Sequence, residues 1–166
     1  PIYAAPPLLN EKFKQREFDA VLNYWNYTAR LRAAGMKELI KVQELLPELG
    51  VPGRLPLIGY VFEEEWAKTN AKMLKTFFRA SKMARQIMLE SDSEWERLRP
   101  FTRAKNDATL IALRDGYRDG VPKTFGKKQE DAIRAAFAIV AKHGGRKLVG
   151  KSTQLAKGTL WSGETY

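Results

Sequence analysis

The sequence predicts an α/β fold, and two observations support this. Three short apolar segments, at residues 19–24, 36–42 and 57–62, have the length and composition of buried strands. Helical patterns separate the first two segments and follow the third, and this alternation is typical of a parallel α/β sheet. Helical patterns dominate after residue 63, so we expect the carboxy-terminal part to be mostly helical.

The first half of the chain reads as helix, strand, helix, strand. Pro6 and Pro7 suit the first turn of a helix, which leads to the strand at 19–24. A short helix then ends at Gly35, and the second strand follows at 36–42. Strand, helix and strand form a βαβ unit, which is expected to be parallel and right-handed. Proline and glycine residues then mark a linker before the third strand.

The second half is predicted to be helical apart from one short strand at 159–161. The longest helix starts at Glu63 and runs to about Glu90, with acids in its first turn. Its apolar residues fall on one side, and these are Trp66, Met73, Phe77, Ala80, Ala84 and Ile87. Later helices are expected from Ser91 to Pro100, from Asn106 to Gly120 and from Gln129 to His143.

The composition argues against an enzyme. Cysteine is absent and His143 is the single histidine, which excludes thiol catalysis and a zinc site of three or four His or Cys ligands. No Gly-x-Ser-x-Gly motif accompanies the histidine. We therefore expect no catalytic residue, no metal and no cofactor. No apolar run approaches the ~20 residues of a membrane-spanning helix.

The net charge of +10 is unevenly placed, because residues 1–65 sum to −1 and residues 66–166 to +11. Five cations lie on the side of the long helix opposite its apolar residues: Lys68, Lys72, Lys75, Arg79 and Lys82. An alternative function is therefore a basic helical module that binds nucleic acid or acidic partners through the Lys68–Lys82 face. A solvated helix face explains the same pattern and is favoured, since no nucleic-acid-binding motif accompanies it.

The best candidate binding site is the amide and aromatic cluster that follows the first predicted strand. Asn23, Trp25, Asn26 and Tyr27 lie where a strand would give way to a helix, and ligands bind at such positions in open α/β sheets. Ordinary burial explains this cluster equally well. Tyr60, on the third predicted strand, is a further candidate for the same cleft, although core filling accounts for it more simply.

Several segments together resemble the ABC-transporter substrate-binding proteins for nitrate, sulfonates, taurine or thiamine precursors. The segments are Ala5-Pro6-Pro7-Leu8-Leu9-Asn10, Phe18 to Trp25, Leu57 to Phe62, Ser91 to Trp95 and Leu113 to Pro122. The likeness runs along nearly the whole chain but covers only the second half of such a protein. Thiamine-pyrimidine synthases share that superfamily, but their cysteine-rich motif and histidine have no counterpart here.

The resemblance implies a two-lobe periplasmic-binding-protein fold of the type II kind. Residues 1–52 would belong to the far lobe, 53–62 to a linker and crossover strand, and 63–166 to the helical part of the near lobe. The implied partners are a small solute, a membrane permease and the missing amino-terminal half. The implied location is the periplasm, or a lipid anchor outside the cytoplasmic membrane. Residues 1–7 contain no signal sequence, so an internal or processed start is expected. Without the other half, the apolar side of the long helix should be uncovered.

Overall fold

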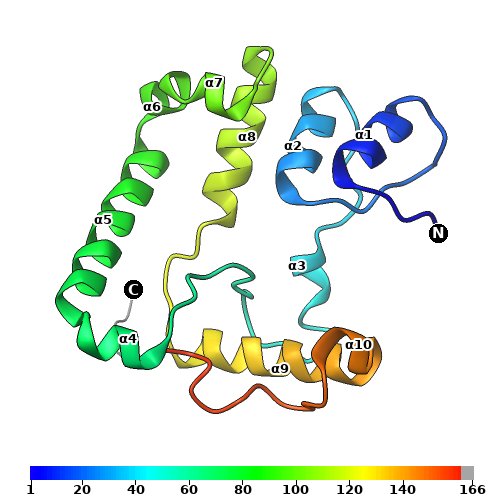
Figure 1. Ribbon diagram of the computed structural model, residues 1–166. Coiled ribbons are helices and arrows are strands. Elements are labelled where there is room, and N and C mark those ends of the chain that lie inside the picture. The colour runs from blue at the N-terminus through cyan, green and yellow to red at the C-terminus, as the bar shows by residue number, and fades with distance from the viewer. Residues whose placement is uncertain (162–166) are drawn as a thin grey trace. The chain divides into compact units, whose positions relative to one another are not determined.

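The computed structural model describes residues 1–161, and every regular element in that range is a helix (Figure 1). No strand and no sheet occur among these residues. The α/β fold class predicted above, with its two-lobe binding-protein architecture, is therefore wrong for this structure. The described helices are α1 (Pro6–Lys14), α2 (Trp25–Ala33), α3 (Val42–Leu45), α4 (Glu64–Thr69), α5 (Ala71–Glu90), α6 (Asp92–Arg97), α7 (Arg99–Thr102), α8 (Asp107–Gly120), α9 (Lys127–Gly144) and α10 (Arg146–Val149).

The segments predicted as strands are irregular and largely exposed. Leu22, Leu39, Ile58 and Val61 all present their side chains to solvent, and Val61 is 97% exposed. A strand is stable only where a neighbouring strand accepts and donates its backbone hydrogen bonds, and these segments form no ladder with one another. Residues 159–161 likewise form no strand.

Most of the predicted helices are confirmed, because their signals are local. Ser91 accepts a hydrogen bond from the Glu94 amide at 3.2 Å, and Asn106 accepts one from the Thr109 amide at 2.9 Å. These are the N-caps of α6 and α8. The long predicted helix is interrupted at Asn70, whose side-chain amide donates to the Trp66 carbonyl at 2.9 Å. An amide that bonds the backbone in this way competes with continued helix formation.

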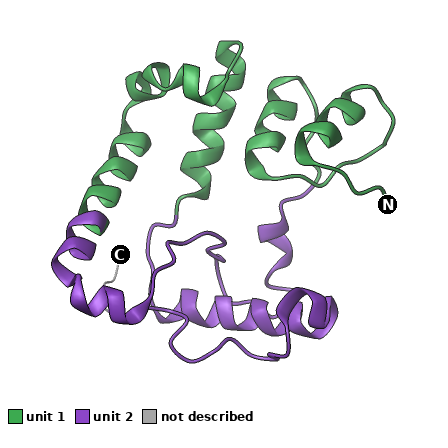
Figure 2. Ribbon diagram, viewed as in Figure 1, with its two compact units in different colours: residues 1–39, 78–121 green, residues 40–77, 122–166 purple. Residues whose placement is uncertain are grey.

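The chain forms two compact units, shown in Figure 2. The first unit contains residues 1–39 and 78–121, and the second contains residues 40–77 and those from 122 onward. Helix α5 contributes to both units. The division of the chain at residues 52 and 62, which was drawn for the lobes of a binding protein, stays a prediction.

Trp95 is at the centre of the first unit's core. It packs in a cluster with four other buried residues of this unit, which are Ala29, Ala104, Leu110 and Leu113. Its indole nitrogen donates to the Met88 carbonyl at 2.9 Å, so the burial of the ring leaves no polar atom unpaired. The core thus joins α2, α6, α8 and the end of α5.

Charged side chains fix the same helices at their ends. Asp92, at the start of α6, pairs with Arg114 and Arg118 of α8, each at 2.8 Å. Arg30 of α2 donates to the Thr102 carbonyl at 2.5 Å and thereby attaches α2 to the end of α7. These contacts set the position of α2 and α8, which carry the residues considered below.

The second unit has a smaller core, made of Leu46, Val51 and Ala132. Gln43 holds the loop after α3 in place, because its side chain donates to the Gly53 carbonyl and accepts from the Leu55 amide. Leu55 and Ile139 pack around the three buried residues. The loop that contains Val51 is thus fastened against α9.

Candidate functional site

Four of the five predicted binding residues lie at the amino-terminal end of α2. No side chain caps this end of the helix, so the backbone N–H groups of Trp25 and Asn26 have no intrahelical partner. Trp25 is 47% exposed, and its ring centroid lies 6.4 Å from that of Tyr117 on α8. The indole therefore has one side against the protein and another side open to a ligand.

Asn26 and Tyr27 follow Trp25 but point in different directions. Successive residues of a helix are about 100° apart, so Asn26 neighbours Trp25 while Tyr27 lies about 200° away. The Asn26 side chain makes no hydrogen bond within the described part of the chain. Its amide can therefore donate to and accept from a ligand next to Trp25. The structure does not bring the Tyr27 ring to that position.

Asn23 is already engaged in a network of amides. Its Nδ2 donates to the Pro6 carbonyl at 3.0 Å and to Asn10 Oδ1 at 2.9 Å, and its Oδ1 accepts from the Tyr24 amide. Asn10 is 4% exposed and itself donates to the Tyr27 carbonyl at 3.0 Å. The two asparagines thus attach α1 to the first turn of α2. In this structure Asn23 holds the site in position.

We expect Asn10→Ala to lower the free energy of unfolding by about 1–3 kcal/mol, because it removes the two hydrogen bonds that join the buried Asn10 to the Asn23 amide and the Tyr27 carbonyl. Chemical denaturation followed by circular dichroism measures this change. Glu11→Ala is the control, since it removes only an exposed ion pair with Lys14 on the same helix. Equal losses in the two variants would contradict a structural role for the amide network.

Tyr60, the fifth predicted residue, belongs to the second unit. Its ring contacts Phe77 edge to face, with centroids 4.8 Å apart, and more than half of its surface is exposed. Its part in ligand binding stays a prediction.

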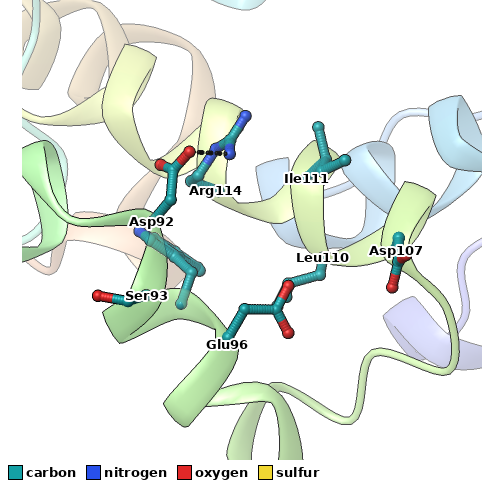
Figure 3. Close-up of a pocket in the computed structure, with 8 residues that line it drawn as sticks. Asp92, Ser93, Glu96, Asp107, Leu110, Ile111 and Arg114 are labelled. Atoms are coloured by element: carbon teal, nitrogen blue, oxygen red, sulfur yellow. Dashed lines mark hydrogen bonds and ion pairs between the residues drawn. The ribbon is translucent and has the colours of Figure 1, made fainter.

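A small cavity of about 260 Å³ lies in the first unit, where the amino-terminal ends of α6 and α8 meet (Figure 3). Its lining mixes polar and apolar side chains and consists of Asp92, Ser93, Trp95, Glu96, Asp107, Leu110, Ile111 and Arg114. Arg114 pairs with Asp92 across this cavity, as the dashed line in Figure 3 marks. This volume is slightly below the range of about 300–1,000 Å³ that is usual for ligand pockets.

The charged groups of this cavity are already paired with one another. Arg99 bonds Glu96 at 2.8 Å and Asp107 at 2.7 Å, and these contacts, with Glu96 contributing most, raise the pKa of the guanidinium. Arg114 bonds Asp115 as well as Asp92. A ligand would have to displace these pairs, so we regard the cavity as a structural feature of the α6–α8 junction.

The cations of the predicted basic face fall into two groups. Lys68, on α4, pairs with Glu64 and Glu65, and the hydrogen bond to Glu65 is the main reason that its pKa is raised. The other four are exposed on α5, and no ion pair joins them to a carboxylate in the described part of the chain: Lys72, Lys75, Arg79 and Lys82. Binding of nucleic acid or an acidic partner through this face stays a prediction.

Sequence reasoning missed two residues of α8 that lie against Trp25. Tyr117 lies within the helix predicted from Asn106 to Gly120, but nothing in the sequence pattern placed it beside Trp25. Gly116 allows the indole to come close, since a Cβ at this position would lie 3.2 Å from Trp25 Cε3. Both contacts depend on the packing of α2 on α8, which no local signal reports.

The fold and the site together define a helical protein in two compact units, with an aromatic and amide site at the start of α2. No protein-family model matches the sequence, and no curated protein matches it. Within residues 1–161, none of the helices has both the length and the apolar character needed to cross a bilayer.

Proposed function

We propose that this chain is part of the solute-binding component of an ABC importer and binds a small organic or anionic solute at the start of α2. One observation carries the proposal. A half-exposed indole, an asparagine amide without a hydrogen bond and an uncapped helix end occur together at Trp25 and Asn26. The sequence resemblance described above supplies the class of protein.

Each group has a distinct role in this proposal. The indole of Trp25 covers apolar surface of the solute, supported from behind by Tyr117 and Gly116. The free N–H groups of α2 point toward its anionic or polar head, because a helix amino terminus carries partial positive charge. The Asn26 amide adds a hydrogen bond that orients this head. Asn23 acts indirectly, by fixing α1 against this helix end.

The partners belong to the same proposal. A membrane permease receives the solute, and a further polypeptide contributes the rest of the solute-binding component, of which this chain is about half. A periplasmic or lipid-anchored location follows from this role. Tyr27 and Tyr60 stay predicted contacts, and Tyr27 would reach the solute only if ligand binding changes the conformation of the first turn of α2.

Isothermal titration calorimetry with nitrate, alkyl sulfonates and thiamine precursors tests the proposal. We expect one of these solutes to bind, and Trp25→Ala and Asn26→Ala each to weaken its affinity about tenfold or more, since each removes a direct contact. Trp66→Ala is the matched control, because Trp66 is similarly exposed, at 44%, but lies on α4.

Two results would reject the proposal. The first is that none of the three solute classes binds. The second is that Trp25→Ala binds the solute as tightly as the unaltered chain while retaining its circular dichroism spectrum. If Trp66→Ala lost as much affinity as Trp25→Ala, the binding site would not be specific to the start of α2.

A further inference from the structure

The carboxy-terminal part of the second unit carries positive charge without compensating acids. Between Asp131 and Glu164 the sequence contains six lysines and arginines and no acid, although 19 of the 166 residues are acidic overall. The surfaces of soluble domains usually mix both signs, so a stretch of one sign indicates a partner of opposite charge. Five of these cations lie within residues 142–157, here called the basic segment: Lys142, Arg146, Lys147, Lys151 and Lys157.

All five cations of the basic segment are exposed and available to a partner. No hydrogen bond or ion pair engages their side chains within residues 1–161. Several cations elsewhere are balanced at close range, as Lys12 is by Glu17 and Arg97 is by Glu94. The positive charge of the basic segment therefore has no local compensation in the described chain.

The basic segment begins within the folded second unit, at the end of α9. Lys142 lies in the last turn of α9, and α10 follows with Arg146 and Lys147 (Figure 1). Helix α10 is fixed to α9, because the Leu148 side chain packs on Gly144, where a Cβ would lie 2.6 Å from Leu148 Cδ2. These three cations are therefore held near the same end of α9.

The spacing of residues 145–152 also matches that of a nucleotide-binding P-loop, Gly-x-x-x-x-Gly-Lys-Ser. A P-loop joins a strand to a helix, and its free backbone amides hold the phosphates. Here α9 precedes the glycine, and residues 151–161 contain no helix. The Leu148 amide already donates to the Gly145 carbonyl at 3.1 Å. The basic segment therefore offers cationic side chains to phosphate, without the backbone cradle of a P-loop.

Charge and composition favour a membrane surface as the partner. Anionic phospholipid headgroups form a dense array of phosphates that attracts clusters of Lys and Arg. Proteins that bind single-stranded nucleic acid stack bases on aromatic side chains, but no Phe, Tyr or Trp lies between Phe137 and Trp161. Helix α10 is a single turn, too short to bury an apolar face in the bilayer, so contact would be limited to the headgroups.

We propose that the basic segment binds the anionic phospholipid headgroups of the membrane that holds the permease. The choice of a bilayer over duplex nucleic acid or an acidic protein rests on the proposed function, which places the chain beside this membrane. Attachment by cations alone is peripheral and reversible, because salt screens interactions between exposed charges. Such attachment would keep the solute-binding component close to the permease that receives the solute.

Co-sedimentation of the full chain with lipid vesicles tests this proposal. We expect the chain to bind vesicles of phosphatidylcholine that contain phosphatidylglycerol, and not to bind vesicles of phosphatidylcholine alone. Binding should be lost in about 1 M salt, where the Debye length is only about 3 Å.

A triple variant of the basic segment locates the surface. Arg146→Gln, Lys147→Gln and Lys151→Gln together remove three of its five cations and are expected to weaken vesicle binding at least about tenfold. All three side chains are exposed, so this variant should keep its circular dichroism spectrum.

A second triple variant is the matched control. Lys12→Gln, Lys14→Gln and Arg97→Gln lower the net charge by the same amount, but these cations are paired with carboxylates in the first unit. Exposed pairs of this kind contribute little to stability, so the control should also stay folded. We expect it to change the affinity for vesicles less than about threefold, since its cations are already balanced locally.

Four results would overturn the proposal: no binding to phosphatidylglycerol vesicles, equal binding to phosphatidylcholine alone, undiminished binding by the segment variant, or an equal loss in the control. A labelled DNA duplex and labelled polyglutamate, titrated by fluorescence anisotropy, represent the other polyanions. Tighter binding to either one, lost in the segment variant, would assign the basic segment to nucleic acid or to an acidic protein instead.

Solute binding and vesicle binding are measured separately, so the failure of one proposal is distinguishable from the failure of the other. Trp25→Ala should bind vesicles as the unaltered chain does, and the segment variant should bind solute as the unaltered chain does. Vesicle binding without solute binding would reject the proposed function. Solute binding without vesicle binding would reject the role of the basic segment alone.

Discussion

Trp95→Ala is expected to lower the free energy of unfolding by about 3–5 kcal/mol, the usual cost of removing a buried tryptophan side chain. The ring is 4% exposed, lies in the buried cluster of the first unit and contacts the Tyr117 ring of α8, with centroids 5.5 Å apart. Its removal also breaks the hydrogen bond to the Met88 carbonyl and leaves a cavity between α6 and α8. Denaturant titration followed by circular dichroism measures the loss.

Trp66→Ala provides the control for this prediction. Trp66 is half-exposed on α4 and contributes to neither buried core. Its replacement should change the free energy of unfolding by about 0.5 kcal/mol or less, as is usual for surface substitutions. If Trp95→Ala were as mild as Trp66→Ala, the helix packing of the first unit described here would be incorrect.

Leu46→Ala has the largest expected effect in the second unit and should lower the free energy of unfolding by about 2–5 kcal/mol. Leu46 packs with Val51 and Ala132, and these three residues form the buried cluster that lies against α9. A small core has few other contacts to compensate for a cavity. Hydrogen exchange of the α9 amides, followed by mass spectrometry, reports the loss directly.

Leu49→Ala is the matched control, since Leu49 lies three residues further along and is exposed. In the Leu49→Ala variant, the amides of α9 should exchange at the same rate as in the unaltered chain. Faster exchange in Leu49→Ala than in Leu46→Ala would show that α9 is held by a different set of contacts.

The proposed binding site was only partly readable from the sequence. The cluster from Asn23 to Tyr27 was recognisable as a group of amides and aromatics. Its division into an engaged Asn23 and an available Asn26 depends on Asn10, which lies thirteen residues before Asn23 and buries its amide against α2. The contact of Trp25 with Tyr117 spans an even greater separation in sequence. Residue type therefore identified the cluster, and the packing of α1 and α8 assigned the roles.

The long helix provides a second example. The sequence separated its apolar residues from its cations, and both groups appear on different faces of α5 as predicted. On the apolar side Met73 and Ile87 are exposed, whereas the Phe77 ring also packs against Tyr60. The sequence did not reveal that α5 instead packs through a third face, which includes the polar residues Ser81 and Arg85.

The sequence by itself determined most of the helices. A helix satisfies its hydrogen bonds within about four residues along the chain, and its caps at Ser91 and Asn106 act over three. Only the tertiary structure decided that the three apolar segments do not form strands. A strand needs hydrogen bonds from a distant segment, so an apolar run becomes a strand only where a partner lies beside it. In the described chain no such partner is present, and Leu22, Ile58 and Val61 stay exposed.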